Sequence, residues 1–204
     1  MFKIVVLISG NGSNLQQIID HIASGQIKAE ISAVISNRPD VYGLKRAEKA
    51  GIPAIVLDHT QFTDRAAFDQ SLAQIVESYQ PDLVVLAGFM RILSDTFVEQ
   101  FKQRLINIHP SLLPKYKGLH THKRALEDKQ KEHGASVHFV IPELDAGSVI
   151  LQGVVPVKAD DTEETLEKRV HQIEYIIYTK AIQWLVDGKK LDLENPAKIY
   201  LKNP

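Results

Sequence analysis

Short apolar runs alternate with amphipathic stretches along the first half of the chain. The runs typical of buried strands are 2–8, 31–35, 52–57, 83–87 and 105–108. Continuous apolar runs of this length are expected in strands that are covered on both faces. Between the runs, apolar residues recur every three or four positions, which predicts helices. This alternation predicts a Rossmann-like α/β fold, with a mainly parallel central sheet and helices on both faces.

The pattern changes in the C-terminal half. Residues 135–140 and 149–157 have the composition of strands, and the loop between them contains Pro142, Asp145 and Gly147. Two strands joined by such a loop favour antiparallel pairing. We therefore expect an antiparallel C-terminal part beside the parallel sheet.

A long helix is predicted at 163–187. Thr162 and the acids before it suit a helix N-terminus, and Gly188 is placed to end the helix. We expect one domain at 1–188 and a loosely ordered C-terminal tail at 189–204.

Composition narrows the classes of function. The chain has 204 residues, of which 44% are apolar, enough for a sizeable core. Lys plus Arg (24) nearly balances Asp plus Glu (25), so no broad basic field favours nucleic acid. There is no cysteine, which excludes disulfides and thiolate chemistry and fits the cytoplasm. The apolar run 2–8 is too short for a signal or membrane-spanning segment, so we expect no membrane partner.

Two polar side chains lie at the end of the run 105–108. Asn107 and His109 are two residues apart, so on a strand they project to the same face, and Pro110 ends the pairing. An amide donor and an imidazole suit a carbonyl that becomes an oxyanion. The alternative is a plain strand end, with a capping histidine and a solvent-facing asparagine.

A glycine-containing loop, 10–15, follows the first predicted strand and begins the first predicted helix. Leu15 replaces the third glycine of the dinucleotide fingerprint, and no Walker lysine follows. The loop therefore favours a single phosphate, held by its backbone, Ser13 and Asn14 at the helix N-terminus. A turn without a ligand is the alternative.

The run 83–87 leads into a second candidate binding segment. Ligands of open α/β sheets bind beyond the carboxyl ends of the strands, which is where Met90, Arg91, Ile92 and Leu93 are expected. From the residues alone, core packing of the three apolar side chains and a surface position for Arg91 are the alternatives.

Several other polar residues have an ordinary explanation. His120, His122 and His133 could suggest a metal, but a His-x-His pair in a polar loop is more often solvated, and we expect no metal. Asp145, which precedes Ala-Gly, is typical of a turn. Glu174 is expected on the solvated face of the late helix.

Four segments, in order, resemble the phosphoribosylglycinamide formyltransferase family, folate-dependent transferases of purine biosynthesis. They are 9–14 (SGNGSN), 87–93 (AGFMRIL), 107–114 (NIHPSLLP) and 143–145 (ELD). The resemblance extends from residue 2 to about residue 188. The SLLP part is shared with other formyl-folate enzymes, such as methionyl-tRNA formyltransferase.

The resemblance implies transfer of the formyl group of 10-formyltetrahydrofolate to the amine of glycinamide ribonucleotide (GAR). His109 and Asn107 would stabilise the oxyanion formed by attack of the amine on the formyl carbon. Asp145 would favour the His109 imidazolium and, through water, help to remove the amine proton. The folate is a cosubstrate, and neither a metal nor a covalent intermediate is required.

The resemblance also assigns binding residues. The GAR contacts are Gly12, Ser13, Asn14, Gly88, Pro110 and Glu174. The folate contacts are Arg65, Met90, Arg91, Ile92, Leu93, Asn107, Ile141, Pro142, Glu143, Leu144 and Asp145. The late helix departs from the family pattern: Thr179 stands where relatives often have proline, and Ile173 where a polar residue is frequent.

Three other functions remain open at this point. Methionyl-tRNA formyltransferase shares the HPSLLP core but normally adds a C-terminal tRNA-binding barrel, for which this chain is too short. Formyltetrahydrofolate deformylase transfers the formyl group to water and carries an N-terminal regulatory domain. A non-catalytic phosphosugar-binding module would need only the glycine loop. The main expectation is an enzyme with small-molecule partners that is a monomer or a homodimer.

Overall fold

The computed structural model describes residues 1–201, in two compact units: a first unit of residues 1–107 and a second unit that begins at residue 108. The strands of the first unit are β1 (Phe2–Ile8), β2 (Ala29–Ser36), β3 (Ala54–Val56), β4 (Leu83–Leu86) and β5 (Leu105–His109), the last of which crosses the unit boundary. They pair in the order β3-β2-β1-β4-β5, and all of them are parallel.

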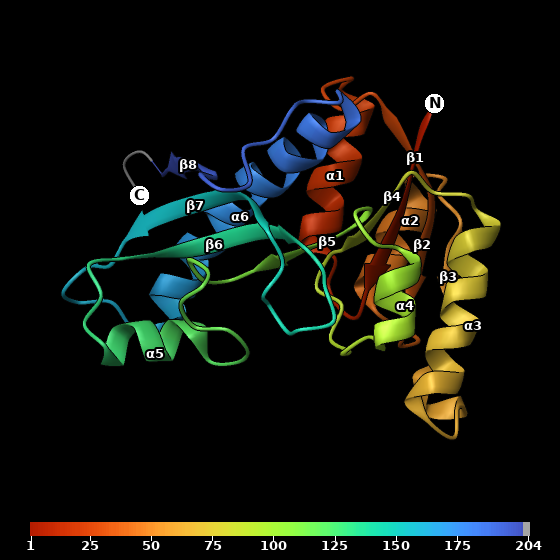
Figure 1. Cartoon of the computed structure of the whole chain (residues 1–204), viewed down its shortest axis with the longest axis horizontal. Coiled ribbons are helices and arrows are strands. Elements are labelled where there is room, and N and C mark those ends of the chain that lie inside the picture. The colour runs from red at the N-terminus through yellow and green to blue at the C-terminus, as the bar shows by residue number, and fades with distance from the viewer. Residues whose placement is uncertain (202–204) are drawn as a thin grey trace. The chain divides into compact units, whose positions relative to one another are not determined.

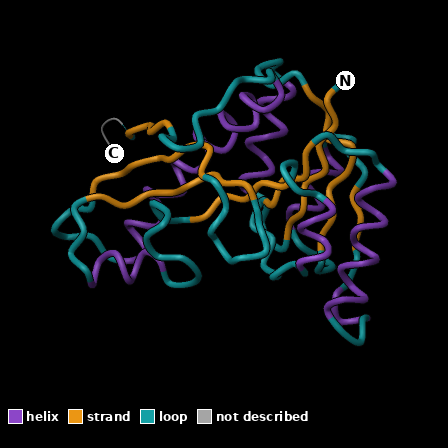
Figure 2. The backbone as a smooth tube through the Cα atoms, in the orientation of Figure 1, coloured by secondary structure: helices purple, strands orange, loops and turns teal. Residues whose placement is uncertain are grey.

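Four helices accompany these strands (Figures 1 and 2). They are α1 (Ser13–Ala23), α2 (Tyr42–Lys49), α3 (Arg65–Ser78) and α4 (Asp95–Gln100), with a short 3₁₀ helix η1 (His59–Gln61) before α3. Helices α1 and α2 pack together, as do α3 and α4. The chain moves outward from β1 to β3 through α1 and α2, and then crosses back to β4 and β5 through α3 and α4. Right-handed connections in these two directions place the two helix pairs on opposite faces of the sheet.

The reversal of strand order between β1 and β4 determines where ligands can bind. Residues Ile4 to Ile8 of β1 have no exposed surface, as expected for a central parallel strand. In open α/β sheets, ligands bind beyond the carboxyl ends of the two strands from which the connections leave in opposite directions, which here are β1 and β4. The segments that leave these ends are 9–12 and 87–91.

The second unit contains three strands and two helices. They are α5 (Thr121–Glu127), β6 (Glu132–Phe139), β7 (Val149–Pro156), α6 (Glu163–Val186) and β8 (Ala197–Tyr200). Strands β6 and β7 are antiparallel, and β8 is parallel to β7. Helix α6 packs on β6 and β7, and α5 packs on α6. The predicted class, mainly parallel α/β with an antiparallel C-terminal part, is confirmed.

Close packing between α6 and β7 accounts for Ile173. A Cβ atom on Gly153 of β7 would collide with the Ile173 side chain, which has no exposed surface. Ile173 therefore fills the space that Gly153 leaves. Thr179, the other departure on this helix, is also buried, and its hydroxyl donates to the Tyr175 carbonyl at 2.8 Å.

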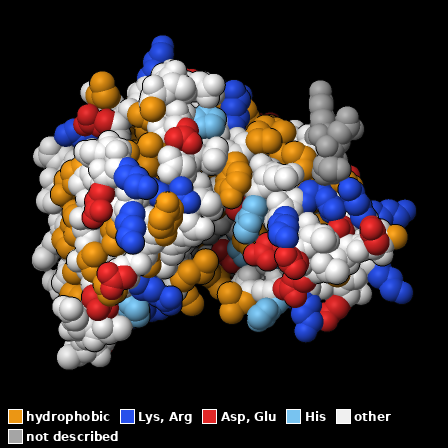
Figure 3. Space-filling model, turned by 180° about the vertical axis from the view of Figure 1, so that it is seen from behind, with side chains coloured by type: hydrophobic (Ala, Val, Ile, Leu, Met, Phe, Trp, Pro, Cys, Tyr) orange, Lys and Arg blue, Asp and Glu red, His pale blue; other side chains and the backbone are white. Residues whose placement is uncertain are grey.

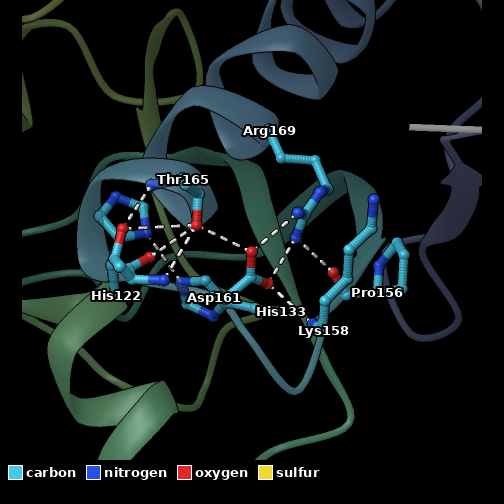
Figure 4. A network of polar contacts seen from close by, with 8 residues as sticks. His122, His133, Pro156, Lys158, Asp161, Thr165 and Arg169 are labelled. Carbon is cyan, nitrogen blue, oxygen red and sulfur yellow. Dashed lines mark hydrogen bonds and ion pairs between the residues drawn. The ribbon is translucent and has the colours of Figure 1, made fainter.

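A network of polar contacts surrounds the N-terminus of α6 (Figure 4). Thr162 accepts the Thr165 backbone N–H at 3.2 Å, as the predicted capping residue. Asp161 accepts two hydrogen bonds from the Arg169 guanidinium, at 2.7 and 2.8 Å, and Arg169 also donates to the Pro156 carbonyl at 2.8 Å. The Arg169 hydrogen bonds hold the pKa of Asp161 well below its usual range, although burial acts in the opposite direction. The network thus joins the start of α6 to the end of β7.

The predicted strands are confirmed to within a few residues, and so is the late helix, with Gly188 in the left-handed conformation just after it. Helices α2, α4 and α5 were not predicted. The expectation of a loosely ordered tail is wrong for Ala197–Tyr200, which pairs with β7. The extent of a domain at 1–188 stays a prediction. No helix within residues 1–201 combines the length and the apolar character that crossing a membrane requires.

Candidate active site

His109, the last residue of β5, is held between two oxygen atoms. Its Nδ1 atom lies 3.4 Å from Asp145 Oδ2, and its Nε2 atom donates to the Tyr116 carbonyl at 2.8 Å. The His109 and Asp145 side chains are 8% and 7% exposed. The structure therefore places the imidazole and the carboxylate in direct proximity, in a largely buried setting.

Asp145 is fixed by its turn. Its φ of 49° is in the left-handed region, which Asp tolerates better than most residues. Gly118 donates its backbone N–H to Asp145 Oδ2 at 2.9 Å, and Oδ1 lies 3.8 Å from His138 Nε2. A Cβ on Gly147 would collide with the Phe139 carbonyl, so the loop returns tightly against β6. The sequence feature was correctly identified as a turn, and the turn directs the carboxylate at His109.

His138 is a neighbour of Asp145 that the sequence analysis did not single out. It is buried on β6, and its Nδ1 atom lies 2.9 Å from the Phe139 carbonyl. Burial lowers the pKa of His138, although the hydrogen bond to Phe139 and the Asp145 charge act in the opposite direction. Period-2 alternation along β6 could have placed His138 on an inward face, but nothing in the sequence connects it with Asp145.

Asn107 lies two residues before His109 on β5. Alternation along a strand directs both side chains to the same side, while the intervening Ile108 is buried on the other. Asn107 is half-buried, and Pro110 follows at the strand end. The strand that the sequence predicted is confirmed, and the joint role of the two side chains stays a prediction.

The glycine loop of the first unit has the geometry of an anion site. Gly12 caps α1 in the left-handed conformation (φ 73°) and provides no side-chain cap. The first N–H groups of a helix lack intrahelical partners, and they attract anions together with the helix dipole. Gly12 also lies so close to α2 that a Cβ would stand 2.8 Å from the Gly43 Cα. Glycine is therefore required at position 12 for two reasons.

Arg46 of α2 is a site residue that the sequence analysis missed. Its guanidinium donates to the Asn11 carbonyl (2.9 Å), to Asn11 Oδ1 (3.0 Å) and to Gln16 Oε1 (3.0 Å), and it lies 4.7 Å from the centre of the Tyr42 ring. Arg46 thereby ties the glycine loop to the first turns of α1. No local signal could have found it, because α2 itself was not predicted.

The segment after β4 exposes two apolar side chains. Gly88 is in the left-handed conformation (φ 75°), and Met90 and Ile92 are 72% and 62% exposed. Core packing is therefore the wrong interpretation for Met90 and Ile92, whereas Leu93 is buried. The Arg91 guanidinium lies 4.6 Å from the centre of the Phe68 ring. Exposed apolar side chains beside a constrained backbone are suited to a flat aromatic ligand.

The other predicted binding residues lie on loops, except Arg65 and Glu174. Arg65 is exposed at the first position of α3. Exposed positions in the loop after β6 are Ile141, Pro142, Glu143 and Leu144, and Glu143 pairs with Lys117 at 3.0 Å. Glu174 is only 6% exposed, so the solvated-face interpretation is wrong. Burial and the Glu174 charge both raise the pKa of Tyr178.

Two histidines form a buried contact in the second unit. His122 Nδ1 lies 3.2 Å from His133 Nε2, with the rings perpendicular, whereas His120 is exposed. Burial lowers the pKa of His133 to about 4. The expectation that His122 is solvated is wrong, because α5 packs on α6 and buries it. Within residues 1–201, no group of three or more metal-ligating side chains was found.

Acidic and basic side chains are interspersed on the face drawn in Figure 3. This distribution agrees with the nearly balanced charge of the chain. No single-sign field is evident on that face, so recognition of an anion depends on local groups such as those of the glycine loop.

Comparisons with known proteins agree with one another. The family model described as formyl transferase matches residues 2–182. The phosphoribosylglycinamide formyltransferase of Escherichia coli K12 is 55% identical over 195 residues, which are 96% of this chain and 92% of that protein. The Haemophilus influenzae enzyme of the same name is 47% identical over 189 residues, 93% of this chain and 89% of that protein. The solved structure of phosphoribosylglycinamide formyltransferase from Coxiella burnetii has a TM-score of 0.91 at 48% identity, covering 97% of this chain and 99% of that one.

Proposed function

Since the chain belongs to the formyl transferase family, we propose how its residues carry out the activity of its relatives, formyl transfer to glycinamide ribonucleotide. Phosphoribosylglycinamide formyl transfer, a step of purine biosynthesis, is the function that the full-length similarity supports. The donor that we propose is 10-formyltetrahydrofolate. The observation that carries the catalytic assignment is the buried His109–Asp145 pair at the end of the strand that also bears Asn107.

The reaction needs an oxyanion stabiliser and a proton acceptor. The GAR amine attacks the formyl carbon, and negative charge develops on the formyl oxygen. His109 and Asn107 stabilise the charge on that oxygen, and Asp145 accepts the amine proton through water. The C–N10 bond then breaks, N10 gains a proton, and formyl-GAR and tetrahydrofolate leave. Asp145 also holds the imidazole in position, since it lies against Nδ1.

Donor and acceptor are assigned to different segments. The proposed GAR contacts are Gly12, Ser13, Asn14, Gly88, Pro110 and Glu174. The proposed folate contacts are Arg65, Met90, Arg91, Ile92, Leu93, Asn107 and residues 141–145. The uncapped helix N-terminus at Gly12 supports the phosphate assignment, and the exposure of Met90 and Ile92 supports the pterin assignment. A monomeric or homodimeric state and a cytoplasmic location stay predictions.

Competing acceptors provide the direct test of function. Purified protein is incubated with 10-formyltetrahydrofolate and, separately, with GAR, water alone or methionyl-tRNA. Formyl-GAR should be the main product. Faster formylation of the tRNA, or hydrolysis at the same rate with and without GAR, would indicate one of the other formyl-folate enzymes. Binding of GAR without any transfer would indicate a non-catalytic module.

The catalytic assignment predicts that substitutions of the two polar residues of β5 lower kcat strongly. Asn107→Ala and His109→Ala should each lower kcat by ~10²- to 10³-fold, the usual effect of losing one oxyanion donor. His171→Ala is the matched control, since His171 lies half-exposed on α6, where it pairs with Glu167 at 3.9 Å. A folded His109→Ala protein with the turnover of the His171→Ala control would remove His109 from the mechanism.

A further inference from the structure

The buried hydroxyl of Ser9 joins two substrate-binding segments of the first unit. Ser9 follows β1 directly and donates its backbone N–H to the Gly88 carbonyl at 3.1 Å. Its Oγ atom accepts the backbone N–H of Met90 at 2.8 Å. The residue that precedes the glycine loop is thus bonded, through backbone and side chain, to the segment that follows β4.

Asn37 sets the direction of these hydrogen bonds. The Ser9 hydroxyl donates to Asn37 Oδ1 at 2.5 Å, so its hydrogen is committed and a lone pair faces the Met90 N–H. Asn37 is fully buried just after β2, and His59 Nδ1 lies 2.7 Å from its carbonyl oxygen. The position of the Met90 amide therefore depends on a chain of contacts that passes through Ser9 to Asn37.

We propose that Ser9, oriented by Asn37, is a positioning residue for the formyl-folate donor. The inference rests on the proposed role of 90–93 as the pterin segment. Without the Ser9 hydroxyl, the Met90 N–H would lose its partner in a part-buried site, and such a loss is costly enough to displace the backbone. A displaced segment would no longer present Met90 and Ile92 to the donor, and small errors in positioning are expensive in catalysis.

The hydroxyl is not needed to pair β1 with β4. That pairing continues through the backbone, where the Ala87 N–H donates to the Leu7 carbonyl at 2.9 Å. Loss of the Ser9 side chain should therefore leave the sheet intact and affect the segment beyond it. An intact sheet with a displaced 90–93 segment would distinguish a positioning role of Ser9 from a merely structural role.

The test compares Ser9→Ala with Ser36→Ala. Ser36 is a likewise buried serine at the end of neighbouring β2, and its hydroxyl donates to the Arg38 carbonyl at 2.7 Å. Ser9→Ala should raise KM for the donor about tenfold, or about 1.4 kcal/mol, with KM for GAR unchanged. Ser36→Ala should change neither KM, while both variants lose similar thermal stability.

Hydrogen exchange provides a readout that does not depend on activity. The Met90 amide should exchange faster in Ser9→Ala than in wild type, whereas the Ala87 amide should keep its protection. An unchanged donor KM in Ser9→Ala, or an equal rise in Ser36→Ala, would overturn the proposal. If wild-type protein failed to formylate GAR, the proposed function would fall, and the Met90 exchange rate would still decide whether Ser9 holds this segment.

Discussion

Arg46 shows how one side chain can hold the backbone of the proposed phosphate site in shape. The guanidinium presents a planar set of donors, and three of them bond to the glycine loop and to Gln16 of α1. A lysine ammonium at the same place has no fixed fork and cannot reproduce this pattern. The conformation of the loop, and with it the direction of its N–H groups, therefore depends on arginine at this position.

Replacing Arg46 by lysine should weaken binding of GAR while preserving charge. We expect KM for GAR to rise about tenfold, equivalent to about 1.4 kcal/mol, because the Asn11 carbonyl and side chain lose their common donor. KM for the donor should not change. Arg38→Lys, at an exposed position after β2, is the control. Steady-state kinetics with each substrate varied in turn measure both constants, and equal KM values for GAR in the two variants would contradict the role of Arg46.

At the scale of elements, the start of α6 illustrates a buried ion pair beside a helix N-terminus that Thr162 caps. Asp161 bonds the Arg169 guanidinium, the Lys158 backbone N–H and the Thr165 hydroxyl. The Asp161 and Arg169 side chains are almost entirely buried. Removal of one partner would leave the other charge buried without compensation, which costs more than the pair itself contributes.

Asp161→Asn should therefore destabilise the protein by about 3 kcal/mol, the effect typical of breaking a buried ion pair. Glu164→Gln is the matched control: Glu164 pairs with Lys168 at 2.6 Å on the same helix, but both side chains are largely exposed. Such surface ion pairs contribute little to the free energy of unfolding. Urea unfolding at pH 7 measures how much each variant differs from the wild type in free energy of unfolding. If both variants had the same midpoint, burial of the Asp161 pair would have no energetic importance.

At the scale of the whole molecule, buried histidines should govern acid stability. Burial lowers the pKa values of His122 and His138, and that of His133 from 6.5 to about 4. Between pH 6.5 and about 4 the unfolded chain binds protons that the folded chain does not. Stability is therefore fully present above pH 6.5 and is lost as the pH falls through this window.

The prediction is tested with His133→Phe, which keeps an aromatic ring beside Tyr116 and removes one titrating group. Unfolding free energies of wild type and variant are measured at intervals from pH 7 to pH 4.5. The decline towards acid should be shallower in the variant by up to about 1.4 kcal/mol per pH unit, the value for one proton. Parallel curves would show that His133 does not contribute to the acid sensitivity.

The fold was predictable from sequence wherever a local signal was long or capped. Strand β1 contains the continuous apolar run 4–8, and Thr162 and Gly188 mark the limits of α6. Helix α2 follows Val41, whose side chain cannot cap the helix, and β8 has only four residues, which pair with β7. Elements of this kind depend on contacts with distant parts of the chain, which a single sequence does not contain.

The same division applies to the candidate site. Asn107 and His109 could be paired because strand alternation is a local rule. The approach of Asp145 to His109 could be expected only from the family resemblance, since 36 positions separate them in sequence. His138, Ser9 and Arg46 act through spatial neighbours, and periodicity carries no information about such neighbours.

The shortness of β3 limits aggregation between copies of this chain. An outer strand offers unpaired backbone groups on which another chain can add a strand, and long flat edges of this kind promote aggregation. In the first unit, β3 is the outer strand beside β2 and has only three residues, Ala54–Val56. Three residues offer too few backbone groups for a neighbouring chain to add a stable strand. The short β3 therefore opposes extension of the sheet into an intermolecular sheet.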